Sequence, residues 1–208
     1  MPYIFEEDDS APGEIGYDLR IPEDWEHLDL SPEGLRQRQA EILRQMSGAD
    51  PERIRILNNT FNDWFTSQHT AEQVGLINAA GAFHRYEDGI FMATVSVFRF
   101  EQEPGTRFDP MEMIRLMHPP ERMAEADDHL ETGVIDIEGL GLCTRAQGIV
   151  THQHDEITVR AVVAHTFAKV TGTRYWLMIS CNSPVSAEAD AVLDLFDAIT
   201  GTLRIWSR

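Results

Sequence analysis

The stretch of residues 157–206, ITVRAVVAHTFAKVTGTRYWLMISCNSPVSAEADAVLDLFDAITGTLRIW, decides the fold. Its alternating apolar residues predict two strands, at 157–167 and 175–181, with a turn at Thr171-Gly172 between them. Ser183-Pro184 ends the second strand, and Gly201 ends the helix that follows. The apolar stripe of that helix consists of Val192, Leu195, Phe196, Ile199 and Leu203. This region therefore predicts a sheet with a helix packed across it.

The N-terminal part of the chain carries start signals for two consecutive helices. Ser31-Pro32-Glu33 combines a capping hydroxyl, a proline at the first helical position and an acid in the first turn, and Asp50-Pro51-Glu52 repeats the combination. Before them, apolar anchors in residues 17–30 predict two short strands separated by a turn at Pro22-Glu23-Asp24. Residues 1–16 are polar and acidic, so we expect a mobile N-terminus there and a single α+β domain over residues 17–208.

Between these regions the apolar residues again recur with a period of two. Residues 76–85 and 90–100 predict a hairpin around Glu87-Asp88-Gly89, whose second strand has two partly apolar faces, as a central strand does. Asp109-Pro110 predicts the start of a third helix, which His118-Pro119-Pro120 ends. An acidic connector, residues 121–131, leads to strands at 134–137 and 140–150. We therefore expect an antiparallel sheet of about six strands, covered by the N-terminal helix pair and the C-terminal helix.

The order of these elements resembles a group of uncharacterised proteins from high-GC Gram-positive bacteria, whose architecture is a Mog1/PsbP-like α/β/α sandwich. The residues that carry the resemblance are the opening Leu19-x-Ile21-Pro22-x-x-Trp25, Tyr175-Trp176-Leu177, Ser183-Pro184, Leu195-Phe196-Asp197-Ala198-Ile199 and Thr202-Leu203-Arg204. The resemblance implies a Mog1/PsbP-like fold and, by analogy, a role in binding other proteins. No catalytic residues belong to the pattern, so the resemblance implies none.

The net charge of −18 is the strongest signal in the composition. Phosphate backbones and anionic lipid heads are repelled by such a charge, so we expect neither nucleic-acid nor membrane binding. The excess is concentrated in residues 1–50, which hold 13 Asp and Glu against 4 Arg. An acidic surface of this kind either keeps the protein soluble or attracts a basic protein partner. The sequence leaves both interpretations open.

Compartment and cysteine usage give one expectation each. No apolar run is long enough for a membrane span, and the first residues lead into acid rather than a basic signal-peptide start, so we expect a cytoplasmic protein. Cys143 and Cys181 are the two cysteines, and we expect both to be buried free thiols rather than a disulfide.

The segment His152-Gln153-His154-Asp155-Glu156 holds the candidate metal ligands of the sequence. In an extended chain His152 and His154 lie on the same face, where they could hold one metal ion together with His165 or Glu156. The alternative is a solvated turn between two strands, because no third and fourth ligands are fixed by the sequence. We favour the turn and expect no metal site.

Methionines gather around the third predicted helix: Met92, Met111, Met113, Met117 and Met123. They could form an adaptable interaction surface, or they could fill the core beneath the helix. The helical spacing of Met111 with Ile114 favours core filling.

Two functions from different classes fit these observations. The first is a non-enzymatic protein-binding or accessory domain with an acidic surface. The second is an enzyme of unknown class whose site is assembled from dispersed residues, such as His84, Arg160, His165 and Tyr175. We favour the first, because the sequence contains no Gly-x-Ser-x-Gly, P-loop or His-Glu-x-x-His pattern. We accordingly assign no catalytic, cofactor-binding or metal-binding residue.

Overall fold

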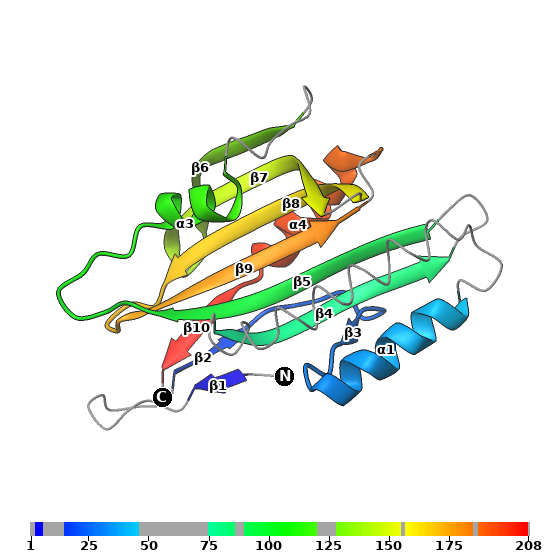
Figure 1. Ribbon diagram of the computed structural model, residues 1–208. Coiled ribbons are helices and arrows are strands. Elements are labelled where there is room, and N and C mark those ends of the chain that lie inside the picture. The colour runs from blue at the N-terminus through cyan, green and yellow to red at the C-terminus, as the bar shows by residue number, and fades with distance from the viewer. Residues whose placement is uncertain are drawn as a thin grey trace.

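The computed structural model describes residues 3–5, 15–45, 75–85, 90–119, 128–154, 157–184 and 187–207. Within these residues, seven antiparallel strands form one large twisted sheet in the order β3-β4-β5-β9-β8-β7-β6 (Figure 1). The strands are β3 (Glu26–His27), β4 (Leu76–Arg85), β5 (Ile90–Glu101), β6 (His129–Ile137), β7 (Gly141–His154), β8 (Ile157–Lys169) and β9 (Tyr175–Ser183).

A second, smaller sheet joins the two ends of the described chain. It has three strands in the order β1-β2-β10, and they are β1 (Tyr3–Phe5), β2 (Ile15–Asp18) and β10 (Arg204–Ser207). In this sheet Ile205 pairs with Tyr17, whose side chain is fully buried. The small sheet thereby closes one end of the core beneath the large sheet (Figure 1).

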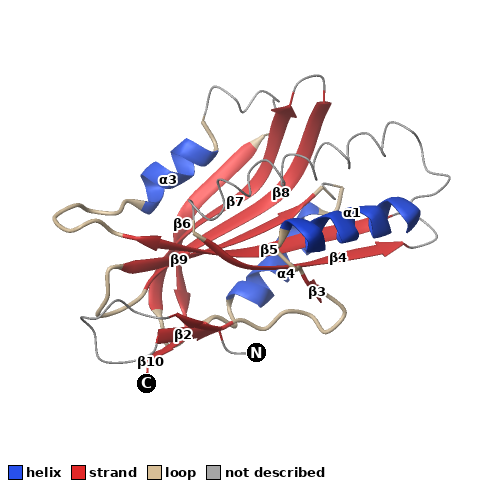
Figure 2. Cartoon of the chain, turned by 60° about the horizontal axis from the view of Figure 1, so that its bottom comes forward, coloured by secondary structure: helices blue, strands red, loops and turns tan. Residues whose placement is uncertain are grey.

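Two helices lie on opposite faces of the large sheet (Figure 2). α4 (Ala189–Thr200) packs against β7, β8 and β9 on one face, and α3 (Pro110–Met117) packs against β7 on the other. A third helix, α1 (Pro32–Gln45), lies beside the β3–β4 edge, where Arg38 forms an ion pair with Glu26 at 2.6 Å. None of the helices that the structure describes is long and apolar enough to cross a membrane.

The core follows from the alternation of the central strands. On the α4 face, Leu177 and Ile179 of β9 pack with Val162 of β8 and with Phe196 of α4. On the α3 face, Phe167 of β8 packs with other buried residues, namely Ile114, Ala146 and Met178. Residues 161–168 of β8 are all buried, because this strand has a paired neighbour on each side and a packed helix over each face.

The predicted fold class is confirmed in its coarse form, an α+β protein with a mostly antiparallel sheet. The hairpin of β4 and β5, the central position of β5, and α1, α3 and α4 agree with the sequence patterns. Gly172 has the left-handed backbone, with φ of 82°, that the predicted β8–β9 turn requires. The Mog1/PsbP-like architecture stays a prediction, and the second helix of the N-terminal pair lies outside the described residues.

The bounds of two predicted elements need correction. The large sheet has seven strands among the described residues, broadly as expected, but residues 129–131 belong to β6 rather than to an acidic connector. The C-terminal helix ends at Thr200, so Leu203 lies beyond it and fills the core from the turn before β10. The boundary between a mobile segment of residues 1–16 and a domain from residue 17 stays a prediction, although β1 lies within that segment and β2 crosses its end.

Candidate functional site: an exposed strand edge with an acidic border

The strand β6 forms one side of the large sheet, and most of its residues are exposed. This strand is the last in the order of the large sheet and pairs with β7 over its whole length, from His129 opposite Ile149 to Ile137 opposite Gly141. Of its nine residues, six are exposed and one, Ile137, is buried. Within the described part of the chain, β6 has no second strand neighbour, and we call the side without one its open edge.

Two large apolar side chains are exposed beside this edge. Val134 of β6 is 63% exposed and Leu142 of β7 is 79% exposed. Val134 pairs with Thr144, and Leu142 pairs with Asp136, so the two apolar residues are diagonal neighbours on one face of the sheet. α3 lies on this same face of the sheet. Ala146 is two residues from Thr144 along β7, so it shares the face of Thr144, and it packs against Ile114 of α3.

Carboxylates border the same edge on both faces of the sheet. Glu131 and Asp136 are exposed, and the alternation of side chains along a strand places them on opposite faces of β6. Glu138 follows in the β6–β7 turn and forms an ion pair with Arg204 at 3.1 Å. Asp136 also acts on its surroundings, since burial together with the Asp136 charge raises the pKa of the Cys143 thiol. The edge therefore combines open backbone, apolar side chains and negative charge.

The rest of the α3 face is closed by aromatic and methionine side chains. Phe108 stacks on Phe100 with ring centroids 5.7 Å apart, and its ring lies 5.0 Å from that of Trp176. Three methionines of α3, Met111, Met113 and Met117, pack against the buried cluster below the helix. Core filling thus accounts for these three, as the sequence favoured, while Met123 lies outside the described residues.

Two buried histidines meet at the C-terminal end of α3. His118, the residue that caps α3, and His165 of β8 place their Nε2 atoms 2.8 Å apart, and their exposed fractions are 8% and 4%. At this distance one Nε2 donates a hydrogen and the other accepts it. The pair fixes the end of α3 to the centre of the sheet.

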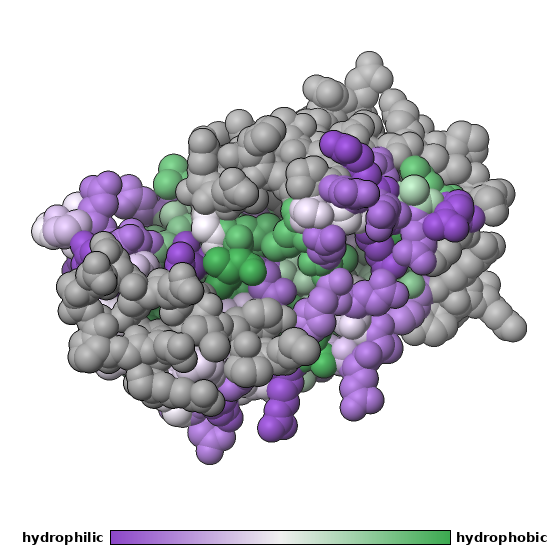
Figure 3. All heavy atoms as spheres, turned by 90° about the horizontal axis from the view of Figure 1, so that it is seen from below, coloured by the Kyte–Doolittle hydropathy of each residue, from purple (hydrophilic) through white to green (hydrophobic). Residues whose placement is uncertain are grey.

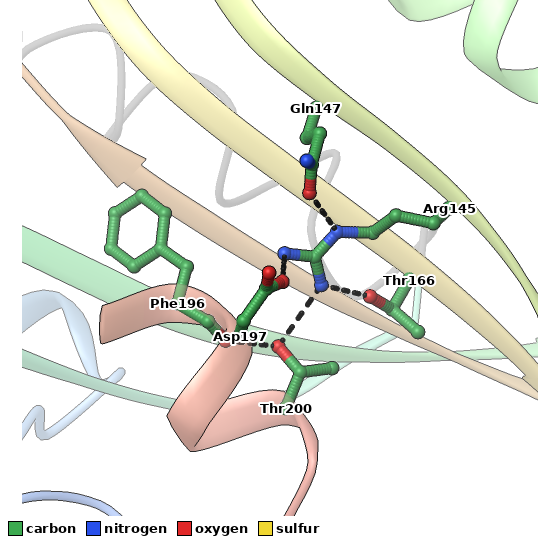
Figure 4. A network of polar contacts seen from close by, with 6 residues as sticks. All are labelled: Arg145, Gln147, Thr166, Phe196, Asp197 and Thr200. Carbon is green, nitrogen blue, oxygen red and sulfur yellow. Dashed lines mark hydrogen bonds and ion pairs between the residues drawn. The ribbon is translucent and has the colours of Figure 1, made fainter. Parts of the chain in front are cut away.

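A second buried polar network lies on the α4 face (Figure 4). The guanidinium of Arg145 on β7 donates to Gln147 Oε1 at 3.0 Å, to Thr166 Oγ1 at 2.7 Å and to Thr200 Oγ1 at 3.2 Å, and it forms an ion pair with Asp197. Burial lowers the pKa of Arg145, and the neighbouring Asp197 carboxylate opposes that shift. Every partner is supplied by the protein itself, so this network fastens α4 to the sheet.

The histidines of the 152–156 segment are placed by their backbone alone. His152 and His154 extend β7 and pair with Val159 and Ile157, so they belong to a strand rather than to the turn that we expected. Their side chains, and Asp155 and Glu156, lie outside the described residues. Among the side chains that the structure does describe, no group of three or more His, Cys, Asp or Glu could hold a metal ion.

The four residues considered for a dispersed active site do not come together. The Nε2 atom of His84 lies 3.1 Å from an Asp24 carboxylate oxygen, and His84 pairs with Phe91 of β5, whereas Tyr175 pairs with Glu101 of β5. Phe91 and Glu101 are about 33 Å apart along β5, at about 3.3 Å per residue. His84 and Tyr175 therefore lie at opposite ends of this strand.

The other two residues of that set are no closer to a common site. Arg160 pairs with Thr151 near the N-terminal end of β8, and alternation places His165 on the opposite face from Arg160.

Cys143 and Cys181 are both buried free thiols, as predicted.

One pocket in the described part of the chain is lined by apolar side chains and Asn78. The lining residues are Leu19, Ile21, Asn78, Ala79, Ala80, Val95 and Val97. Asn78 can donate and accept hydrogen bonds, and none of the lining side chains is an acid, a base or a nucleophile. A view of the molecule from below shows mostly hydrophilic described atoms around a central hydrophobic area (Figure 3).

The comparisons with known proteins include a weak structural likeness. No family model matches the chain, and no curated protein matches it in sequence. The structure of LpqN, a protein of Mycobacterium tuberculosis involved in cell envelope biogenesis, matches with a TM-score of 0.46 and 10% sequence identity, over 99% of this chain and 90% of that one. A likeness of this degree carries no argument about function. The resemblance inferred from the sequence therefore stays a prediction.

Proposed function

We propose that this protein is a non-enzymatic binding domain that holds a basic protein partner at the β6 side of its sheet. The observation that carries the proposal is the pair of neighbouring apolar side chains, Val134 and Leu142, exposed by 63% and 79% beside an acidic strand edge. Burying such side chains against a partner removes apolar surface from water, which is the main favourable term in protein association.

The charge of the surface indicates the sign of the partner. Asp136 lies on the same face as the apolar pair, Glu131 lies on the opposite face of β6, and Glu138 lies in the turn that follows, where it pairs with Arg204. The whole chain carries a net charge of −18. Such a surface attracts positively charged proteins and speeds their encounter, and it repels nucleic acids and anionic membranes. Association should therefore slow as salt rises, because ions screen the attraction over about 8 Å at physiological ionic strength.

The experiment compares three forms of the full-length protein. In the double variant Val134→Ser with Leu142→Ser the apolar pair is removed, and in Leu116→Ser another exposed leucine, on α3 and 71% exposed, is removed as a matched control. Proteins captured from the source organism are identified and purified, and their affinities are measured for each form. We expect a partner whose binding weakens in the double variant but not in the control. A partner that binds all three forms equally contradicts the proposal.

We do not propose an enzymatic function. The four residues considered for it lie on two faces and at distant ends of the sheet, and no observation in the described residues gathers another set of acid, base and nucleophile in one pocket. A binding function accounts better for the exposed pair of Val134 and Leu142, because binding uses the surface directly.

A further inference from the structure

The open edge of β6 presents backbone groups as well as side chains. In an antiparallel pair, every second residue of an edge strand directs its N–H and C=O away from the neighbouring strand. β6 is nine residues long, so its open edge extends for about 30 Å at about 3.3 Å per residue. An edge of this length is a template for one more strand.

We propose that the occupant of this edge is an extended, basic segment of a partner protein that adds to β6 as a further strand of the sheet. The inference rests on the proposed function, which names the surface, and it adds how the partner is held. Recognition by strand addition takes affinity from main-chain hydrogen bonds and specificity from alternate side chains.

The side chains of β6 fit an incoming strand on both faces. On the α3 face Val134 and Thr132 would lie beside the new strand, and on the α4 face Glu131 would do so. Gly133, at the centre of β6, is exposed, and a Cβ added to it would meet no atom within 4 Å. No bulky side chain at this position blocks an incoming strand.

The carboxylates decide which strand is admitted. Glu131 and Asp136 lie on opposite faces of β6, so a segment with basic residues on either face meets a carboxylate. Opposite charges across neighbouring strands stabilise the pairing and like charges destabilise it. A second copy of this chain is the wrong partner, because it would bring another β6 edge with the same carboxylates and another net charge of −18.

Charged residues on an edge strand also serve to prevent unwanted pairing. If the carboxylates only prevent pairing, the β6 edge should reject every strand. If they select a partner, as we propose, the edge should reject acidic strands and a second copy of the chain but accept basic strands. The sign of the accepted peptide therefore separates the two interpretations.

The test uses the full-length protein and a fluorescent nine-residue peptide of alternating lysine and valine. Two further peptides carry N-methyl groups on the odd or on the even residues, and a fourth peptide has glutamate in place of lysine. We expect the lysine peptide to bind and the glutamate peptide not to bind. One N-methylated peptide should lose about tenfold or more in affinity, since it loses several backbone hydrogen bonds, while the other stays within about twofold.

A charge-reversed variant, Glu131→Lys with Asp136→Lys, provides the second arm. After a thermal melt has established that it folds, it should prefer the glutamate peptide. Amide hydrogen exchange on the unmodified protein gives a measurement that needs no variant, because alternate amides of β6 should become protected when the lysine peptide binds.

The outcomes separate this inference from the proposed function. If both N-methylated peptides bind alike, or no peptide binds, or two copies of the chain pair through β6, strand addition is wrong. The proposed function is then tested only by the partner affinity of the double variant, Val134→Ser with Leu142→Ser. If that variant leaves partner binding unchanged while the N-methyl pattern is as expected, the backbone edge rather than the apolar pair holds the partner.

Discussion

Arg145 on β7 and Asp197 on α4 form an ion pair across the interface between sheet and helix. The two ends of the pair differ in their access to water, since Arg145 is 3% exposed and the Asp197 side chain is 53% exposed. The guanidinium has given up its hydration, whereas the carboxylate has kept about half of its own. This asymmetry decides which partner of the pair is more costly to remove.

Removing the carboxylate should destabilise the protein more than removing the guanidinium. Asp197→Ala leaves a buried cation with neutral partners only, and we expect a loss of roughly 1–3 kcal/mol, below the value for a fully buried pair because water reaches Asp197. Arg145→Met removes the buried charge and lets Asp197 hydrate, so its cost should be lower, about 1 kcal/mol. Urea unfolding measures both variants.

An exposed ion pair of the same chain serves as the control for that measurement. Arg174 and Glu101 lie 2.7 Å apart, and both side chains are about half exposed. Glu101→Ala should change the free energy of unfolding by less than about 1 kcal/mol, as for most surface pairs. If Arg145→Met proves more costly than Asp197→Ala, the hydrogen bonds to Thr166 and Thr200 outweigh the ion pair.

The packing of α4 gives a larger effect that does not involve charge. Phe196 is fully buried between α4 and the sheet, so Phe196→Ala should lower the free energy of unfolding by roughly 3–5 kcal/mol through the cavity it leaves. Asp194→Ala, at an exposed position of the same helix, should change it by less than about 0.5 kcal/mol. Equal losses in urea or thermal melts would mean that the helix buries a different face.

The elements that the sequence predicts well are those with local causes. Asp109-Pro110 predicts a helix start, and Asp109 Oδ1 accepts a hydrogen bond from the backbone N–H of Met111 at 2.9 Å. Alternation likewise predicts the β4–β5 hairpin and the buried faces of β8 and β9. Each of these signals depends on residues a few positions apart, which one sequence displays directly.

The features that the sequence does not reveal depend on distant segments. Arg145 is surrounded in β7 by small and polar residues, and its partners Thr166, Asp197 and Thr200 come from other elements. His118 precedes two prolines and reads as a helix stop, so its bond to His165, 47 residues away, has no local signal. The exposed pair of Val134 and Leu142 likewise emerges only once β6 is the last strand of the sheet.

The histidine pair should contribute to stability as a hydrogen bond between buried groups. His118→Leu leaves the Nε2 of His165 without this donor or acceptor, and we expect a loss of about 1–3 kcal/mol in the free energy of unfolding. His118→Gln offers a side-chain amide at the same place and should recover part of that loss. In protein labelled with ¹⁵N, a scalar coupling between the two Nε2 atoms would report the bond directly. Equal losses for Leu and Gln would mean that ring packing, not the bond, stabilises the end of α3.

Cys181 should make the protein sensitive to alkali. Burial raises the pKa of its thiol from the ordinary value of 9.0 to about 12, although the charge of Arg145 opposes the shift. The unfolded chain therefore loses this proton near pH 9, while the folded protein keeps it up to about pH 12. Below pH 9 the contribution to stability is fully present, and it declines as the pH rises through that window.

The size of this alkaline loss can be isolated with Cys181→Ala. At pH 10, one unit above the unfolded value, the wild type should have lost about 1.4 kcal/mol through this thiol relative to pH 7, a loss that the variant lacks. Urea unfolding at pH 7 and pH 10 gives the difference between the two proteins. Native Cys181 should also resist thiol reagents at pH 8, because the reactive thiolate is scarce and buried. A thiol that reacts at once in the folded protein, or a stability difference independent of pH, would show that Cys181 is accessible to water.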